Sequence, residues 1–352
     1  MANLTSWLFF CAVLGGPRQR VSVPLGETMK QILKRGLAIL AICSAGFCQS
    51  SLAASDLVLE PIKVSEHVYY FGGEASMANA ANKGFMSNAG FVVTSDGVVV
   101  FDALGTPPLG EAMIAAIKTV TDQPVRRVIV SHYHADHVYG LQELKVHGAE
   151  VWAHQNGQSY PGSDEARERL AQREVDLAPW VDDKTHVVSA DRWLEFSDGN
   201  TIPFSVGNMR FRVIDASGAH SPEDIMLYVE EDGVLFSGDL FFTGRIPFVG
   251  TANSKSWLNT LDSMLEVNPK IVVPGHGRAS TTPDEDMQLT RDYLLYLRDQ
   301  MGAAVEEMAT FEEAYEHTDW SRFAQYPAFE DANRINAYGT YLLMERESLD
   351  TE

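Results

Sequence analysis

Histidine and aspartate side chains with the spacing of metal ligands recur along this chain of 352 residues. Four of them fall within one short segment, because residues 132–137 read His-Tyr-His-Ala-Asp-His. Three more follow at long intervals: His220, Asp239 within Ser-Gly-Asp, and His276 within Pro-Gly-His-Gly. Imidazole and carboxylate ligands suit zinc, with iron or manganese as alternatives. If these side chains converge in space, they would hold metal that activates water to split an acyl bond.

The segment 132–137 divides naturally between two metal ions. His132 and His134 stand at alternate positions of an extended stretch, so their side chains can point the same way. Asp136 and His137 then turn away toward a second ion. We expect the histidines outside this pattern to be structural or exposed; they are His67, His147, His154, His186 and His317.

Strands and helices alternate around these candidate ligands. An apolar strand over 125–130 leads into the histidine motif, and another over 270–273 leads into Pro-Gly-His-Gly. Hairpins are expected over 90–101 and 226–236. Helices are expected over 107–120, which two prolines open, over 163–174, over 254–266 with a serine cap, and as three helices after residue 283. Residues 74–88 should form a loop, either a flap over the site or a plain surface loop. The pattern favours mixed sheets covered by helices.

The N-terminal 54 residues have a different character. From Met29, basic residues precede an apolar stretch over 36–48 and small residues up to 54, which is the layout of a secretory signal peptide. The apolar stretch is about half the ~20 residues of a membrane-spanning helix. We therefore expect a periplasmic or secreted protein without a stable membrane anchor. Residues 29–54 would be the signal peptide and 1–28 a mis-assigned extension; a longer, unusual export signal is the alternative.

The net charge and the positions of the cysteines argue against several kinds of binding partner and site. The formal net charge of −21 argues against nucleic acid, whose phosphates would be repelled. Cys11, Cys43 and Cys48 all lie in the N-terminal region. The chain beyond residue 54 therefore has no cysteine for a disulfide, a nucleophile or a metal site. A small-molecule carbonyl compound is the expected partner, and nothing in the sequence indicates the oligomeric state.

The motifs together resemble those of the metallo-β-lactamase-fold hydrolase superfamily. The resemblance covers about residues 64–280 and rests on Asp102 after the strand 98–101, the motif 132–137, His220, Ser-Gly-Asp at 237–239 and Pro-Gly-His-Gly at 274–277. It implies an α/β fold, a four-layer αββα sandwich over residues 55–282. A C-terminal helical extension would occupy 283–352.

The resemblance also implies roles for individual residues. The first zinc would be held by three histidines and the second by an aspartate and two histidines, in the order His132, His134, His220, then Asp136, His137, His276. Asp239 would bridge both ions, and Asp102 would lie behind the site and orient the ligand loop. A metal-bridging hydroxide would attack an ester, thioester or lactam carbonyl, while Asp136 orients that nucleophile and moves its proton.

The residues around Asp239 bear on the subclass. Cysteine-containing zinc β-lactamases have a thiolate where this chain has Asp239, so that subclass is disfavoured. The segment Ser-Gly-Asp-Leu-x-Phe-x-Gly-Arg-Ile-Pro, with Trp257 after it, is similar to exported quinoprotein-relay and sulfur-oxidation-type metallohydrolases. Arg245 within it is a candidate for binding a substrate carboxylate, or else forms a structural salt bridge. A zinc β-lactamase and an iron-dependent sulfur or redox enzyme on the same fold remain the alternatives.

Overall fold

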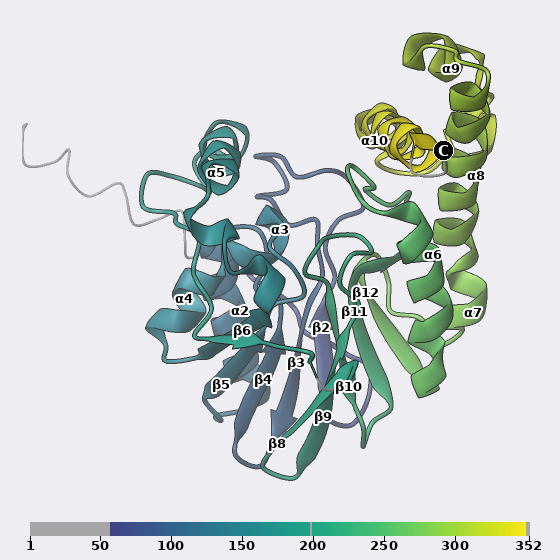
Figure 1. The fold of residues 1–352 in the computed structure, drawn as a ribbon. Helices are drawn as coiled ribbons and strands as arrows, with labels where there is room; N and C mark the ends of the chain where they lie inside the picture. The colour runs from purple at the N-terminus through teal and green to yellow at the C-terminus, as the bar shows by residue number, and fades with distance from the viewer. Residues whose placement is uncertain (1–56, 198, 350–352) are drawn as a thin grey trace, which may run out of the picture. The chain divides into compact units, whose positions relative to one another are not determined.

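The computed structural model describes residues 57–197 and 199–349, which form two β-sheets and the helices that cover them (Figure 1). The first sheet has seven strands in chain order, antiparallel from β1 to β4 and parallel from β4 to β7. Its strands are β1 (Ile62–Lys63), β2 (Val68–Phe71), β3 (Ala89–Thr94), β4 (Gly97–Phe101), β5 (Val125–Ile129), β6 (Glu150–His154) and β7 (Arg192–Leu194).

The parallel strands of this sheet are joined by helical crossovers, as parallel pairing requires. Between β4 and β5 runs α2 (Pro107–Val120), whose first turn holds the predicted prolines. The short helices α3 (Ala135–Val138) and α4 (Leu141–Val146) connect β5 to β6. Between β6 and β7 lie η1 (Gln155–Gly157), η2 (Tyr160–Gly162) and α5 (Asp164–Asp176), which Ser163 caps.

The second sheet has five strands in the order β12-β11-β10-β9-β8, antiparallel except for the parallel pair β11–β12. Its strands are β8 (Thr201–Val206), β9 (Met209–Asp215), β10 (Ile225–Val229), β11 (Val234–Phe242) and β12 (Ile271–His276). The crossover from β11 to β12 contains α6 (Ser254–Ser263) and η3 (Met264–Val267). Asn253, not the predicted serine, caps α6, because the extended backbone lies at Asn253, whose side chain accepts from Ser256 N.

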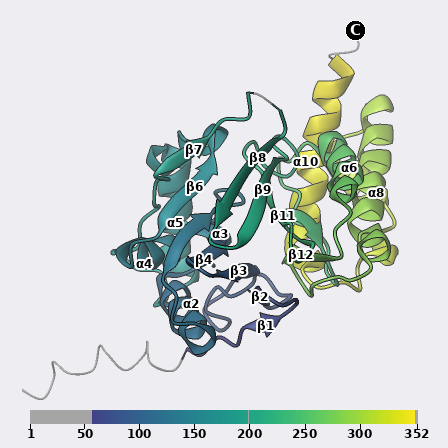
Figure 2. The ribbon, with the colours of Figure 1, turned by 90° about the horizontal axis from the view of Figure 1, so that it is seen from below.

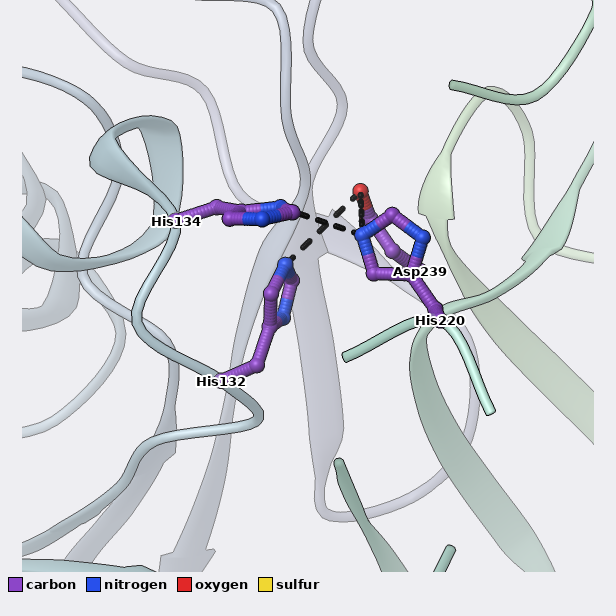
Figure 3. A group of neighbouring side chains, drawn as sticks. All are labelled: His132, His134, His220 and Asp239. Carbon is purple, nitrogen blue, oxygen red and sulfur yellow. Dashed lines mark hydrogen bonds and ion pairs between the residues drawn. The ribbon is translucent and has the colours of Figure 1, made fainter. Parts of the chain in front are cut away.

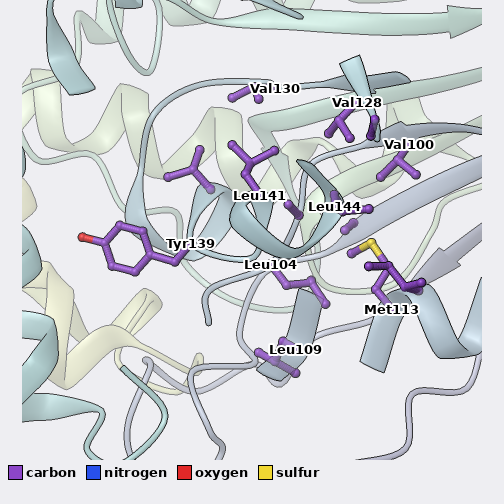
Figure 4. Close-up of a cluster of buried hydrophobic side chains, with 14 of the residues drawn as sticks. Val100, Leu104, Leu109, Met113, Val128, Val130, Tyr139, Leu141 and Leu144 are labelled. Atoms are coloured by element: carbon purple, nitrogen blue, oxygen red, sulfur yellow. The ribbon is translucent and has the colours of Figure 1, made fainter. Parts of the chain in front are cut away.

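Three apolar layers bury the two faces of each sheet. Between the sheets, Phe101 of β4 stacks on Phe236 of β11 with ring centroids 5.4 Å apart. The outer face of the first sheet packs against α2 and α4, where Val100, Met113 and Leu144 meet (Figure 4). The outer face of the second sheet packs against α6 and the C-terminal helices. The predicted αββα arrangement with a C-terminal helical region is therefore confirmed, and Figure 2 shows the helices flanking the sheets.

The C-terminal region is helical, as predicted, but begins with an additional single turn. Its elements are α7 (Pro283–Asp286), α8 (Gln288–Glu306), α9 (Phe311–His317), η4 (Trp320–Arg322) and α10 (Phe329–Leu349). Helix α10 is fixed to the loop after β11: Asn336 Oδ1 accepts from Val249 N at 2.7 Å, and Asn336 Nδ2 donates to Pro247 O at 2.8 Å. Gly339 permits this closeness, because a Cβ there would lie 1.6 Å from Gly250 O.

Three predictions about the division of the chain are not tested by these helices and strands. The extension at 1–28 and the signal peptide at 29–54 lie outside the described residues. The domain limit at residue 282 also remains a prediction. Within the described residues, none of the helices combines the length and the apolar character that crossing a bilayer requires.

Candidate metal centre

The seven predicted ligands come from strand ends and from the loops beside them, on both sheets. His132 and His134 follow β5, and Asp136 and His137 lie on the one-turn helix α3. His134 has an extended backbone, with φ −78° and ψ 147°, and α3 begins directly after it. The three others come from the second half of the chain: His220 precedes β10, Asp239 lies in β11, and His276 ends β12.

A first cluster is formed by His132, His134, His220 and Asp239, whose ligand atoms all lie within 4.8 Å of one another. His220 Nε2 lies 3.0 Å from His134 Nδ1 and 3.6 Å from Asp239 Oδ2. His132 Nε2 lies 4.0 Å from the same carboxylate oxygen. Figure 3 shows the four side chains pointing toward a common centre, which is the geometry of a metal site.

A second cluster is formed by Asp136, His137 and His276, also within 4.8 Å of one another. His276 Nε2 lies 3.4 Å and His137 Nε2 3.5 Å from Asp136 Oδ2. Asp239 joins the two clusters: its Oδ1 lies 3.1 Å from His137 Nε2 and 3.3 Å from His276 Nε2, while its Oδ2 faces the first cluster. One carboxylate thus offers an oxygen to each side.

Several of these atoms are buried and have no hydrogen-bond partner among the described residues. They are His132 Nε2, His137 Nε2, Asp136 Oδ2 and Asp239 Oδ1. Buried polar atoms are rarely left unpaired in a native structure. Nitrogen and carboxylate donors converging in this way fit divalent metal, typically zinc. The side chains of both clusters therefore suit the divalent metal that the sequence predicts.

The electrostatics differ between the two clusters. Burial lowers the pKa of His134 to about 4 and that of His220 to about 3, so both are neutral near pH 7. Burial also opposes the charge of His137, but the carboxylates of Asp239, Asp136 and Asp102 raise its pKa well above the usual value. The carboxylates of the second cluster therefore favour positive charge between them, as a metal cation would supply.

Asp102 lies behind the second cluster, where the resemblance implied it. It directly follows β4, has a left-handed backbone with φ +61°, and is buried. It accepts from Ser131 N at 2.7 Å and Ser131 Oγ at 2.8 Å, and from His137 Nδ1 at 2.8 Å. Because Nδ1 of His137 donates to Asp102, its Nε2 is left as the ligand atom.

His276 is oriented by a residue that the sequence did not single out. Its Nδ1 lies 2.8 Å from the carbonyl oxygen of Met86, which can only accept, so Nδ1 carries the proton and Nε2 faces the carboxylates. Met86 belongs to the predicted loop 74–88. A backbone carbonyl leaves no mark on residue type, so no sequence signal could have found this contact.

Arg245 is fully buried beside His276. Its Nη1 lies 3.4 Å from His276 Nδ1, and its Nη2 lies 3.3 Å from the sulfur of Met77. No ion pair to Arg245 within 4.0 Å occurs among residues 57–197 and 199–349, and its side chain is not among those that line the cavity over the site. A direct role in binding a substrate carboxylate stays a prediction.

A cavity of about 210 Å³ opens onto the ligands. His134, Asp136, Asp239 and His276 reach it, and the other walls come from the loop 74–88, from α3, from α5 and the segment before it, from the loop after β11, and from α10. These wall residues are Met77, Met86, Ala135, Tyr160, Glu165, Arg169, Arg173, Phe248 and Ile335. Larger hollows of about 560 and 660 Å³ between α8 and α10 hold no ligand side chain.

The histidines that are not among the seven predicted ligands do not join either cluster. His67 Nδ1 lies 2.9 Å from Asp232 Oδ1, and His154 Nε2 lies 3.5 Å from Asp215 Oδ1 while its ring stacks on Phe196. Both contacts are structural, away from the cavity.

Comparison with known proteins identifies the family to which this chain is similar. The family model described as the metallo-beta-lactamase superfamily matches residues 82–276. Among curated relatives, a metallo-beta-lactamase type 2 of Bacillus cereus is 26% identical over 213 residues, covering 59% of this chain and 70% of the relative. A linear primary-alkylsulfatase of a Pseudomonas species is 19% identical over 242 residues, 58% of this chain and 44% of that protein. This chain thus spans less than half of the alkylsulfatase.

Solved structures share the fold. The sec-alkylsulfatase Pisa1 from Pseudomonas sp. aligns with a TM-score of 0.58 at 17% identity, over 81% of this chain and 50% of that one. A metallo-beta-lactamase from Pontibacter korlensis aligns with a TM-score of 0.50 at 20% identity, over 67% of this chain and 97% of that one.

Proposed function

Since the chain belongs to the metallo-beta-lactamase superfamily, we propose that it is an exported hydrolase that uses two zinc ions to cleave an ester, thioester or lactam-type carbonyl. Metal-dependent hydrolysis follows from the family and from the cluster of histidines and aspartates. The identity and number of the ions, the bond that is cut and the export are the proposal.

One observation carries the proposal of two ions. The carboxylate of Asp239 directs one oxygen toward His137 and His276 and the other toward His220, with every distance between 3.1 and 3.6 Å. A single metal would need only one of these oxygens. The arrangement suits a bridging ligand between two neighbouring cations.

The residues of the chain have distinct roles in this scheme. Two bound zinc ions would supply a hydroxide nucleophile near neutral pH and would polarise the substrate carbonyl. Asp136 lines the cavity, and despite its burial the imidazoles of His137 and His276 lower its pKa, so its carboxylate stays ionised and can accept a proton from attacking water. Asp102 and the carbonyl of Met86 hold the two imidazoles with Nε2 toward the cavity side.

The test combines metal analysis with a substrate panel. The purified protein is expected to bind two zinc ions and to hydrolyse at least one of an ester, a thioester, an acyl-homoserine lactone and a chromogenic cephalosporin. A long-chain sulfate ester belongs in the panel, because alkylsulfatases are among the relatives. Cleavage of the cephalosporin alone would favour the β-lactamase alternative, and stoichiometric iron would favour the redox alternative.

Variants make the assignment specific. His134→Ala removes one ligand of the first cluster and should abolish hydrolysis together with one equivalent of zinc. His67→Ala is the matched control, since His67 is bound to Asp232 outside both clusters and should keep both metals. Full zinc content and activity in His134→Ala would contradict the proposed site.

The proposed export has a separate test. Expression of the whole chain in a Gram-negative host, followed by fractionation and N-terminal sequencing, should give a periplasmic or secreted protein that begins at or just after residue 54. A cytoplasmic protein that retains residues 29–54 would be inconsistent with export.

A further inference from the structure

Positive charge gathers on one wall of the cavity, although the chain as a whole is strongly acidic. Glu165, Arg169 and Arg173 of α5 all line the cavity and are spaced four residues apart, which places them on one face of the helix. Figure 1 shows α5 and α10 on either side of α3, the helix that carries two of the ligands. The α5 wall therefore faces the metal centre.

Arg169 is the arginine of this wall that forms no ion pair with another described residue. Arg173 forms an ion pair with Asp176, N to O 3.7 Å. By contrast, no carboxylate lies within 4.0 Å of the Arg169 guanidinium among the described residues of the chain. Arg169 is exposed, yet it lines the cavity and its charge acts on His134, Tyr139 and Tyr160, so the guanidinium lies near the ligands.

A buried tyrosine hydroxyl also feels the charges of this wall, although it does not line the cavity. Tyr139 is fully buried, and its hydroxyl has no hydrogen-bond partner within the part of the chain that the structure describes. Figure 4 shows the ring at the edge of the aliphatic cluster, with the hydroxyl directed away from it. Burial raises the pKa of Tyr139, and the charges of Arg173, Arg169 and Asp136 act on its hydroxyl.

Apart from Tyr160, the remaining walls are apolar. Met77 and Met86 come from the loop 74–88, Phe248 from the loop after β11, and Ile335 from α10. A bound molecule would thus meet metal ligands at one end, a guanidinium at another and hydrocarbon between them. Glu165 lines the same wall and Asp176 offsets the charge of Arg173, so Arg169 is the cation of this wall that remains available to an anion.

We propose that Arg169, with Arg173 beside it, binds a carboxylate of the substrate that is distant from the scissile bond. The substrate class is then an anionic acyl compound, in which a short apolar chain separates a free carboxylate from the ester or thioester. This inference rests on the proposed function, because it names the substrate class of that hydrolase. A guanidinium and a carboxylate form the charge-assisted hydrogen bonds that such recognition needs.

The kinetic test uses two esters that differ only in the distant carboxylate: the mono-4-nitrophenyl ester of adipic acid and 4-nitrophenyl hexanoate. After subtraction of the spontaneous rate, kcat/KM of the zinc-loaded protein should be higher for the anionic ester. In Arg169→Gln it should fall about twofold to fivefold for that ester and stay unchanged for the neutral one, since an exposed ion pair is modest in strength. Arg169→Lys should restore part of the loss.

The matched control is Arg167→Gln. Arg167 lies two residues away on α5 but pairs with Asp164 and donates to Gly162 O instead of lining the cavity. This variant should behave as the wild type does. Equal losses in Arg167→Gln and Arg169→Gln, or an equal fall for both esters in Arg169→Gln, would overturn the proposal.

A binding measurement separates this proposal from hydrolysis itself. Adipate and hexanoate can each place one carboxylate on the metal, but only adipate has a second. Calorimetry of the zinc-loaded wild type should show tighter binding of adipate, and the difference should vanish in Arg169→Gln. Arginine-dependent binding without cleavage of any panel substrate would support the anion site and overturn the proposed hydrolysis. Equal binding of both acids by the wild type would overturn the anion site.

Discussion

Replacing Asp102 by asparagine isolates the carboxylate that orients His137. The amide keeps the size of the side chain but exchanges one acceptor oxygen for an NH2 group. In the structure, Ser131 N donates to Oδ1 of Asp102, while His137 Nδ1 and Ser131 Oγ lie against Oδ2. Whichever way the amide is turned, one of the two N–H donors meets another donor.

The magnitude follows from this mismatch. One buried donor without a partner costs about 1–3 kcal/mol. His137 can avoid the cost by moving its proton to Nε2, but Nε2 is then lost as a metal ligand. We therefore expect Asp102→Asn to weaken the second zinc site by about tenfold to a hundredfold, which is the usual effect of losing a partner behind a metal ligand. The first site should be little changed.

The assay is a competition titration with a chromophoric chelator, which gives a separate affinity for each zinc ion. Asp232→Asn is the control, because Asp232 also accepts from a serine hydroxyl, a backbone N–H and a histidine Nδ1, namely those of Ser65 and His67. It should lower thermal stability without changing zinc binding. Wild-type affinity for both ions in Asp102→Asn, or equal zinc loss in both variants, would refute this role of Asp102.

Three further outcomes are expected. Gly275→Ala should reduce zinc content and stability, because a Cβ there would lie 2.0 Å from Asp239 Oδ1; zinc content and thermal unfolding measure both. The second zinc should bind more weakly as pH falls, in competition titrations at pH 6, 7 and 8. Although burial opposes their charge, the neighbouring carboxylates raise the folded-state pKa of His137 and His276, so the metal must displace protons that are bound more fully at lower pH. Tyr139→Phe should leave the free energy of unfolding within about 1 kcal/mol or raise it, since it removes a buried hydroxyl without a partner; a large loss in chemical denaturation would show a missed hydrogen bond.

The features predicted best from the sequence are those that depend on the direction of the chain over a few neighbouring residues. An apolar strand followed by His132 and His134 fixes where those side chains emerge, so their meeting with residues from a second strand end could be anticipated. The cap of α6 could not, because Asn253 and Ser254 are both good capping residues and only the backbone shows which one is extended.

The cavity wall was beyond sequence reasoning for a different reason. Helix α5 is charged around most of its circumference, so nothing in its pattern distinguishes Arg169, which faces the ligands, from Arg167, which does not. The left-handed backbone of Asp102 is likewise decided by the strand end and by Ser131, not by residue type alone. Only the three-dimensional structure shows which side of α5 faces the ligands and which backbone conformation Asp102 adopts.

The attachment of α10 to the loop after β11 has a consequence for how such proteins diverge. The sandwich supplies the metal ligands, whereas Phe248 and Ile335, which that attachment brings to the cavity, belong to a loop and to an added helix. Mutations in these appended parts can reshape the space available to a substrate while the sheets and their ligands stay intact. Selection could therefore change what is cleaved without rebuilding the machinery that cleaves it.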